Sequence, residues 1–159
     1  MIAAVLTVSD GVSAGVREDL SGDLLTELLA GERYAVVRRV VPDEREEIAA
    51  AIRELAEEAV VVLTTGGTGM GPRDITPEAT GSVLDRAAPG IAEAIRADAV
   101  SKTPHGLLSR GVAGVCGRAL VVNLPGSPGG CRDGFAVVRP ALAHAVALLS
   151  GAETAHRQT

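Results

Sequence analysis

A glycine-rich loop between an apolar strand and a proline-headed helix constrains this fold most strongly. The strand, Val60 to Thr64, is apolar until its last residue, as in a strand buried on both faces of an α/β protein. The loop has glycine at 66, 67, 69 and 71, and Thr76 and Pro77 then provide an N-cap and a first helical residue. Glycines let backbone N–H groups turn toward a ligand. The loop therefore predicts an α/β protein that holds an anion at a strand end.

Two common phosphate-binding motifs do not fit this loop. Gly66 and Gly71 have the spacing of a Walker A loop, but Pro72 and Arg73 follow where Lys and Ser or Thr are needed. A dinucleotide-binding fingerprint would need Gly or Ala at position 72. The loop therefore favours an anion site of another class. The alternative is a structural turn without a ligand.

Strand-like and helix-like segments alternate along the whole chain. The pattern predicts a three-layer α/β/α fold with a mainly parallel sheet, helices on both faces, and a small antiparallel strand pair. We expect one α/β domain over residues 1–150 and a C-terminal tail over residues 151–159. The predicted strands are Ile2–Val8, Tyr34–Val41, Val60–Thr64, Val112–Cys116 and Ala119–Asn123. The predicted helices run from a Ser21 cap to Ala30, after Asp43, over Pro77–Ala87, over Pro89–Val100, and over Arg132–Leu149 with Pro140 inside.

Composition argues against nucleic acid and membranes as partners. The chain of 159 residues has a net charge of −5 and only 1% aromatic residues, so it offers neither a basic surface nor rings on which bases stack. No continuous apolar run reaches the length of a membrane span. Ser9 and Asp10 interrupt the apolar N-terminus, which predicts a strand rather than a signal peptide. Cys116 and Cys131 are isolated, which indicates reduced thiols in a cytoplasmic protein.

Polar residues follow several of the predicted strands. Ligands of parallel sheets bind beyond the carboxyl ends of the strands, and four polar segments lie at such ends in this sequence. They are Ser9–Asp10, Pro42–Asp43, Thr65–Asp74 and Asn123–Ser127. Their positions predict a single shared cleft.

Asp74 is the strongest candidate for chemistry, because it lies at the end of the glycine loop. A carboxylate beside bound phosphates needs a cation between them, and Mg²⁺ held by one or two carboxylates and substrate phosphates is the usual arrangement. The structural alternatives are an ion pair with Arg73 or a contribution to the helix cap at Thr76. Asp43 stands three residues before Glu46, a capping arrangement that explains it without chemistry. The sequence shows no Ser/His/Asp triad and no metal-ligand cluster.

Several motifs together resemble one family. They are, in chain order, Thr7–Asp10, Thr64–Gly69, Pro72–Thr80, Leu108–Arg110 and Asn123–Pro128. These motifs cover nearly the whole chain and are similar to those of molybdenum-cofactor biosynthesis proteins of the Mog/MoaB type, which resemble the G domains of gephyrin and its plant counterpart. The block from Gly66 to Pro77 is specific enough to carry the resemblance alone. Gly11 departs from the pattern, since many relatives have a larger residue there.

The resemblance implies a homotrimer of α/β subunits that binds molybdopterin and, in active members, adenylylates it with Mg²⁺ and ATP and releases pyrophosphate. It implies that Asp43 and Asp74 are the catalytic and metal-binding residues, which reverses the capping interpretation of Asp43. The residues that it implies bind molybdopterin or nucleotide are Ser9, Asp10, Thr65, Gly66, Gly67, Thr68, Gly69, Arg73, Ser109, Arg110, Pro125, Gly126 and Ser127. A molybdate-insertion protein is implied as a further partner. Some members only bind the pterin, so a non-catalytic molybdopterin carrier or scaffold is the alternative.

Overall fold

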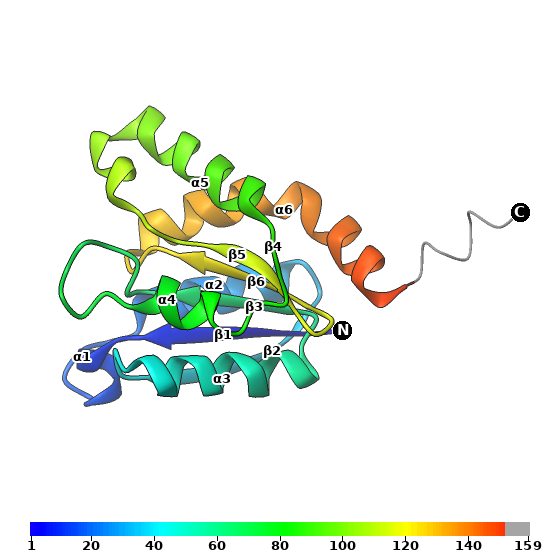
Figure 1. Cartoon of the computed structure of the whole chain (residues 1–159), viewed down its shortest axis with the longest axis horizontal. Helices are drawn as coiled ribbons and strands as arrows, with labels where there is room; N and C mark the ends of the chain where they lie inside the picture. The colour runs from blue at the N-terminus through cyan, green and yellow to red at the C-terminus, as the bar shows by residue number, and fades with distance from the viewer. Residues whose placement is uncertain (152–159) are drawn as a thin grey trace, which may run out of the picture.

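The computed structural model describes residues 1–151 and shows one six-stranded sheet between layers of helices (Figure 1). The strands are β1 (Ile2–Val8), β2 (Ala35–Val41), β3 (Val61–Thr65), β4 (Arg86–Ala87), β5 (Ala113–Cys116) and β6 (Ala119–Leu124). Their order is β2-β1-β3-β6-β5-β4, with the first four parallel and β5 and β4 each antiparallel to its neighbour. The predicted α/β class and mainly parallel sheet are confirmed, and the antiparallel pair gains the short strand β4 at its edge.

Helices cover both faces of this sheet. They are α1 (Asp10–Ser13), α2 (Leu20–Gly31), α3 (Arg45–Glu58), α4 (Thr76–Gly81), α5 (Pro89–Lys102) and α6 (Pro128–Ser150), with a 3-10 turn η1 (Pro104–Leu108). Successive strand residues face opposite sides, so Val5 and Leu63 join the core under α2, α5 and α6. Leu6 and Val62 join the other core, under α3 and α4. Figure 1 shows α3 along one side of the sheet and α5 and α6 along the other.

The first two helices begin differently from the prediction. Residues 10–13, which no predicted helix covers, form α1, because Ser9 Oγ accepts the N–H of Val12 at its start. The cap of α2 is Asp19, whose carboxylate accepts a backbone N–H of the first turn, and not Ser21. Asp and Ser are both residue types that favour the N-cap position, and only the contacts of the side chains in the folded protein show which one caps the helix.

The helix predicted over residues 77–87 is shorter than expected. α4 ends at Gly81, and β4 follows it at the edge of the sheet. The N–H of Asp85 donates to Val115 O at 2.8 Å, and β4 then pairs with β5. This pairing with a strand distant in sequence replaces the helical bonds that the local pattern favoured.

α6 begins at Pro128, one turn earlier than predicted, and continues through Pro140. Ser127 caps it by accepting the N–H of Gly130, and proline is suited to the turn that follows a cap. α6 is 23 residues long and is the one helix within residues 1–151 with the length and apolar composition of a membrane span. Its buried face, which includes Phe135, packs on the sheet. Except for its first residue, the predicted tail lies outside the described residues.

Candidate functional site

Two adjoining cavities lie at the edge of the sheet where the four parallel strands end. This edge is at the left in Figure 1, where the β1 arrow points and α1 lies. The larger cavity has a volume of about 630 Å³ and the smaller about 440 Å³. Gly67, Asp74, Gly126 and Ser127 line both cavities and form a shared wall. All four predicted strand-end segments contribute lining residues, so the cleft expected from the sequence is one site with two lobes.

The larger cavity lies between the glycine loop and the elements α5, η1 and α6. Lys102 and His105 bring polar groups to this mainly apolar space. Lys102 Nζ lies 2.7 Å from Asp98 Oδ2 and 3.2 Å from Asp133 Oδ2. No sequence motif marks these residues, because only the packing of α5 against α6 brings them to the site. The apolar residues that line the cavity include Met70, Ile95, Ala99, Leu108 and Pro125.

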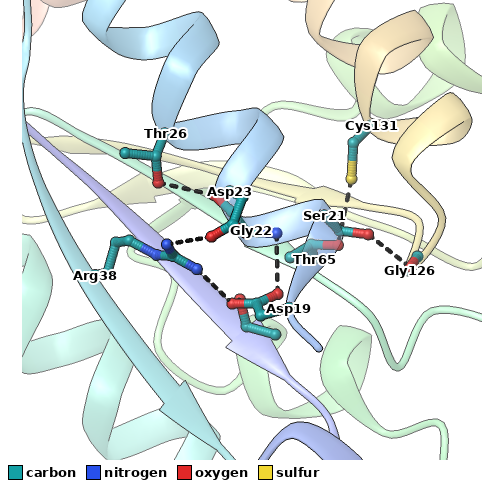
Figure 2. Close-up of polar contacts among 10 residues, drawn as sticks. Asp19, Ser21, Gly22, Asp23, Thr26, Arg38, Thr65, Gly126 and Cys131 are labelled. Carbon is teal, nitrogen blue, oxygen red and sulfur yellow. Dashed lines mark hydrogen bonds and ion pairs between the residues drawn. The ribbon is translucent and has the colours of Figure 1, made fainter. Parts of the chain in front are cut away.

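The smaller cavity is more polar and lies between β1, the start of α2 and β3. Arg17 and Asp19 line it and were not predicted. Arg17 makes no hydrogen bond or ion pair with any group of residues 1–151, so its guanidinium is available to an anion. Asp19 Oδ2 accepts a hydrogen bond from Thr7 Oγ1 at 2.7 Å. It also accepts one from Arg38 at 2.8 Å (Figure 2). The predicted residues that line this cavity include Ser9, Asp43, Thr65 and Gly66.

The segment Pro125–Ser127 is held from inside the protein. Ser21 Oγ donates to Gly126 O at 2.8 Å, and Thr65 Oγ1 donates to Pro125 O at 2.7 Å. Figure 2 shows Thr65 beside Cys131, whose Sγ lies 3.1 Å from Pro125 O. The two backbone carbonyls beside the shared wall are therefore fixed by buried or half-buried side chains.

Asp43 and Asp10 exchange hydrogen bonds between the ends of β2 and β1. Asp43 Oδ2 accepts the N–H of Asp10 at 2.9 Å, and Asp10 Oδ1 accepts the N–H of Asp43 at 3.0 Å. Arg73 donates from Nε to Asp10 Oδ2 at 2.7 Å and from Nη2 to Glu44 Oε1 at 2.8 Å. No side chain caps α3, so the capping interpretation of Asp43 is wrong. Its carboxylate lies in the smaller cavity instead.

The carboxylates of Asp10 and Asp43 are stabilised by their neighbours to different degrees. Burial raises the pKa of Asp43 above its ordinary value of 3.8, and the charges of Asp10 and Asp74 add to the rise, while the N–H of Asp10 opposes it. Hydrogen bonds from the Arg73 guanidinium and from the N–H of Asp43 lower the pKa of Asp10. Asp10 is therefore neutralised by the protein, whereas a cation beside Asp43 would relieve a repulsion that remains.

Asp74 lines both cavities and turns back toward the glycine loop. Its Oδ2 accepts the N–H of Gly71 at 2.9 Å. Within residues 1–151 Asp74 forms no ion pair with Arg73, which binds Asp10 and Glu44. No side chain caps α4. Neither structural alternative considered from the sequence therefore accounts for this aspartate.

The glycine loop brings unpaired N–H groups to the cavities. Gly66 and Gly67 have φ values of +98° and +68°, which other residues rarely adopt. A Cβ on Gly66 would also lie 2.2 Å from a backbone oxygen of β1. The N–H groups of Gly67, Thr68, Gly69 and Met70 donate to no acceptor within residues 1–151. Successive free N–H groups in a turn form a concavity that binds anions.

Three residues predicted to bind ligand do not line either cavity. Asp10 and Arg73 bind each other. Arg110 donates to the carbonyl oxygen of Asp74 and pairs with Glu78. These side chains hold neighbouring segments of the cleft. The other predicted ligand-binding residues line one or both cavities: Ser9, Thr65, Gly66, Gly67, Thr68, Gly69, Ser109, Pro125, Gly126 and Ser127.

The donor set of the cleft fits a hard cation. No group of three or more His, Cys, Asp or Glu side chains that could hold a metal ion occurs among residues 1–151. Asp43 and Asp74 nevertheless line the same cavity and interact electrostatically. Two carboxylates suit Mg²⁺, which keeps water and substrate phosphates as its other ligands, and do not suit structural zinc, which takes four protein ligands.

Comparison with protein families and curated proteins identifies relatives over most of the chain. A family model described as "Probable molybdopterin binding domain" matches residues 4–144. The molybdenum cofactor synthesis protein cinnamon of Drosophila melanogaster is 39% identical over 98% of this chain, which spans only 26% of that protein. The molybdopterin adenylyltransferase of Helicobacter pylori strain J99 is 39% identical over 92% of this chain and 86% of its own length. The chain thus corresponds to a part of the long relative and to most of the short one.

Solved structures agree with the curated relatives. The molybdopterin biosynthesis enzyme MoaB from Thermus thermophilus is 46% identical, with a TM-score of 0.88 over 94% of this chain and 96% of that chain. A molybdopterin biosynthesis protein from Mycobacterium abscessus is 41% identical, with a TM-score of 0.89 over 96% of this chain and 98% of that chain. The similarity therefore extends over nearly the whole length of both chains.

Proposed function

Because this chain belongs to the molybdopterin-binding domain family, we propose that it is a molybdopterin adenylyltransferase of molybdenum cofactor biosynthesis. Relatives that match over most of their length carry that name. The observation that carries the proposal is the cleft with two lobes, which is lined by free loop N–H groups and two aspartates, with Gly67 and Asp74 in the wall that the lobes share. Each lobe has the volume of a small-molecule site.

The reaction joins two phosphate-bearing substrates. The terminal phosphate of molybdopterin attacks the α-phosphate of ATP, a new P–O bond forms, and pyrophosphate leaves. Such a transfer requires alignment and neutralisation of charge more than a nucleophilic side chain. The N–H groups of the glycine loop bind phosphate oxygens, and the guanidinium of Arg17 adds positive charge in the smaller cavity.

Asp43 and Asp74 are the proposed Mg²⁺ ligands. When bound, Mg²⁺ supplies neutralisation of phosphate charge beside the transferred group. The raised pKa of Asp43 supports this role, because burial first and the charges of Asp10 and Asp74 second disfavour its ionised form, which a cation would stabilise. The fixed hydrogen bond between Asp43 and the N–H of Asp10 orients its carboxylate before any ligand arrives.

Pyrophosphate release tests the proposal directly. The full chain is incubated with molybdopterin, ATP and Mg²⁺, and the adenylylated pterin is identified by mass spectrometry. We expect release only when all three are present, and its loss on addition of EDTA. Tight pterin binding without an adenylylated product would refute the adenylyltransferase and favour the non-catalytic carrier.

We further propose a homotrimer in the cytoplasm that passes its product to a molybdate-insertion protein. The trimer and the partner rest on the family resemblance. The cytoplasmic location is supported by Cys116 and Cys131, which are both free and buried, as expected of a protein in a reducing compartment.

A further inference from the structure

Two carbonyl oxygens of the glycine loop are bound by one residue of α4. Thr76 Oγ1 donates to Gly66 O at 2.9 Å, and the backbone N–H of Thr76 donates to Gly67 O at 3.0 Å. Thr76 is fully buried, so water does not compete for its hydroxyl. One threonine therefore fixes two successive peptide groups at the start of the loop.

The next two carbonyl oxygens are bound by a residue from the segment before β5. The backbone N–H of Arg110 donates to Thr68 O at 2.9 Å, and its Nε donates to Gly69 O at 2.7 Å. The remaining nitrogens of the guanidinium bind the carbonyl of Asp74 and the carboxylate of Glu78. The guanidinium is thus held on several sides, and a single ammonium group lacks the planar fork that makes these contacts together.

The direction of the loop N–H groups follows from these four bonds. In a planar trans peptide, the C=O of one residue and the N–H of the next point in opposite directions, and no peptide bond of residues 1–151 is cis. The carbonyls of residues 66–69 point toward Thr76 and Arg110. The N–H groups of residues 67–70 therefore point away from them, and these residues line the cavities.

We propose that Thr76 and Arg110 are positioning residues that set the peptide planes of the glycine loop so that its N–H groups face the substrate phosphates. This inference rests on the proposed function, because it takes the phosphates as the loop's ligand. The glycines make the loop free to adopt other conformations, and the two side chains remove that freedom. Arg110 acts through the loop and does not touch the ligand.

The chain offers a matched control for each residue. Thr80 is also fully buried in α4, and its hydroxyl accepts a hydrogen bond from Asn123 Nδ2 at 3.0 Å, away from the loop. Arg96 Nη1 donates to the carbonyl of Gly111 at 2.7 Å, also away from the loop. Thr80→Val and Arg96→Lys therefore remove similar bonds without freeing a loop carbonyl.

The test combines anion binding with turnover. Inorganic pyrophosphate is titrated into ¹⁵N-labelled full chain, and the amide signals of residues 67–70 are followed by NMR. Thr76→Val frees the Gly66 carbonyl and Arg110→Lys frees that of Gly69, while the main-chain bonds of both residues remain. We expect both variants to bind pyrophosphate at least ~10-fold more weakly and to lose on the order of 10² in kcat, as when a preorganised donor is removed. Thr80→Val, Arg96→Lys and Thr76→Ser, which keeps the hydroxyl, should remain within about 3-fold of the wild type.

The outcomes separate this inference from the proposed function. If Thr76→Val and Arg110→Lys match their controls in pyrophosphate affinity and kcat, the positioning role is overturned while the adenylyltransferase stands. If pyrophosphate shifts the loop amide signals of the wild type but no adenylylated product forms, the adenylyltransferase proposal is refuted. The pyrophosphate affinities of Thr76→Val and Arg110→Lys, compared with those of their controls, then still decide the positioning role. If pyrophosphate leaves the loop amides of the wild type unshifted, the inference is overturned. Should Thr76→Val fail to fold, Arg110→Lys decides alone.

Discussion

At the scale of single residues, the cleft depends on charges that the protein orients but only partly compensates. Arg73 neutralises Asp10, whereas Asp43 receives a single backbone N–H and faces two further carboxylates. The place of Asp43 in the cleft was not accessible from local sequence, because its hydrogen-bond partner, Asp10, lies 33 residues away. Capping was the simpler local interpretation, and only the family resemblance assigned Asp43 to the site.

Asp43→Asn and Asp74→Asn are expected to reduce turnover much more than stability. Each substitution removes a charge proposed to hold Mg²⁺ and keeps an oxygen that can accept the same hydrogen bond. We expect kcat to fall on the order of 10²-fold or more, with the free energy of unfolding changed by less than about 1 kcal/mol. Pyrophosphate release and urea unfolding measure the two quantities. Full activity in Asp43→Asn would exclude its carboxylate from the metal site.

Asp43 and Asp10 predict opposite pH dependences of stability in buffer without divalent cations. The pKa of Asp43 is raised, so its contribution is fully present below the unfolded value near 3.8 and is lost as the pH rises through the folded value. The pKa of Asp10 is lowered, so its contribution is present above 3.8 and is lost as the pH falls through the folded value. The stability of the wild type relative to Asp43→Asn should therefore fall as the pH rises above 3.8. Relative to Asp10→Asn it should fall as the pH drops below 3.8. Urea unfolding between pH 3 and 6 checks both slopes, and slopes of equal sign would contradict the assignment.

At the scale of elements, the strands were predictable and several helix ends were not. Ile2–Val8 is apolar except at Thr7, and the run over residues 60–63 is apolar throughout, because both strands are covered on both faces of the sheet. Helix ends depend on contacts that a linear pattern does not contain. Asp19 caps α2 while also binding Thr7 and Arg38, and this network excluded the equally plausible Ser21.

Asp19→Ala is expected to destabilise the protein through the start of α2. It removes the cap and leaves the Thr7 hydroxyl without its acceptor, so the free energy of unfolding should fall by about 1–2 kcal/mol. Asp23→Ala is the control. Asp23 lies in the first turn of α2 and also binds Arg38, but its side chain is 59% exposed. Its effect should stay within about 0.5 kcal/mol. Equal losses in urea unfolding would show that the ion pair, and not the cap, stabilises this end.

At the scale of the whole molecule, alternating strands and helices were sufficient to predict the α/β class and the edge of the sheet that carries the site. The extent of the larger cavity was not predictable. Lys102 belongs to α5 and His105 to η1, and they reach the cleft because α5 packs against α6 and η1 packs against α5. A residue that joins a site through helix packing carries no motif of its own.

The proposed homotrimer predicts a definite mass in solution. Light scattering should give three times the 16.1 kDa of one chain, with or without ligand. Exposed apolar side chains outside both cavities, such as Val16, Leu107 and Leu148, are available for subunit contacts. A monomer at micromolar concentration would contradict the assembly proposed here.

The shared wall between the two cavities has a consequence for how long the product stays bound. In the proposed reaction each substrate would occupy one lobe and dissociate independently. The adenylylated pterin would then be a single covalent molecule that spans Gly126 and Ser127 and keeps the contacts of its pterin half and its AMP half, so one half would rebind before the other escapes. This chelate effect would give the adenylylated pterin a longer residence time than either substrate. Its departure would then set the turnover rate and favour direct transfer to the next protein over release into solution.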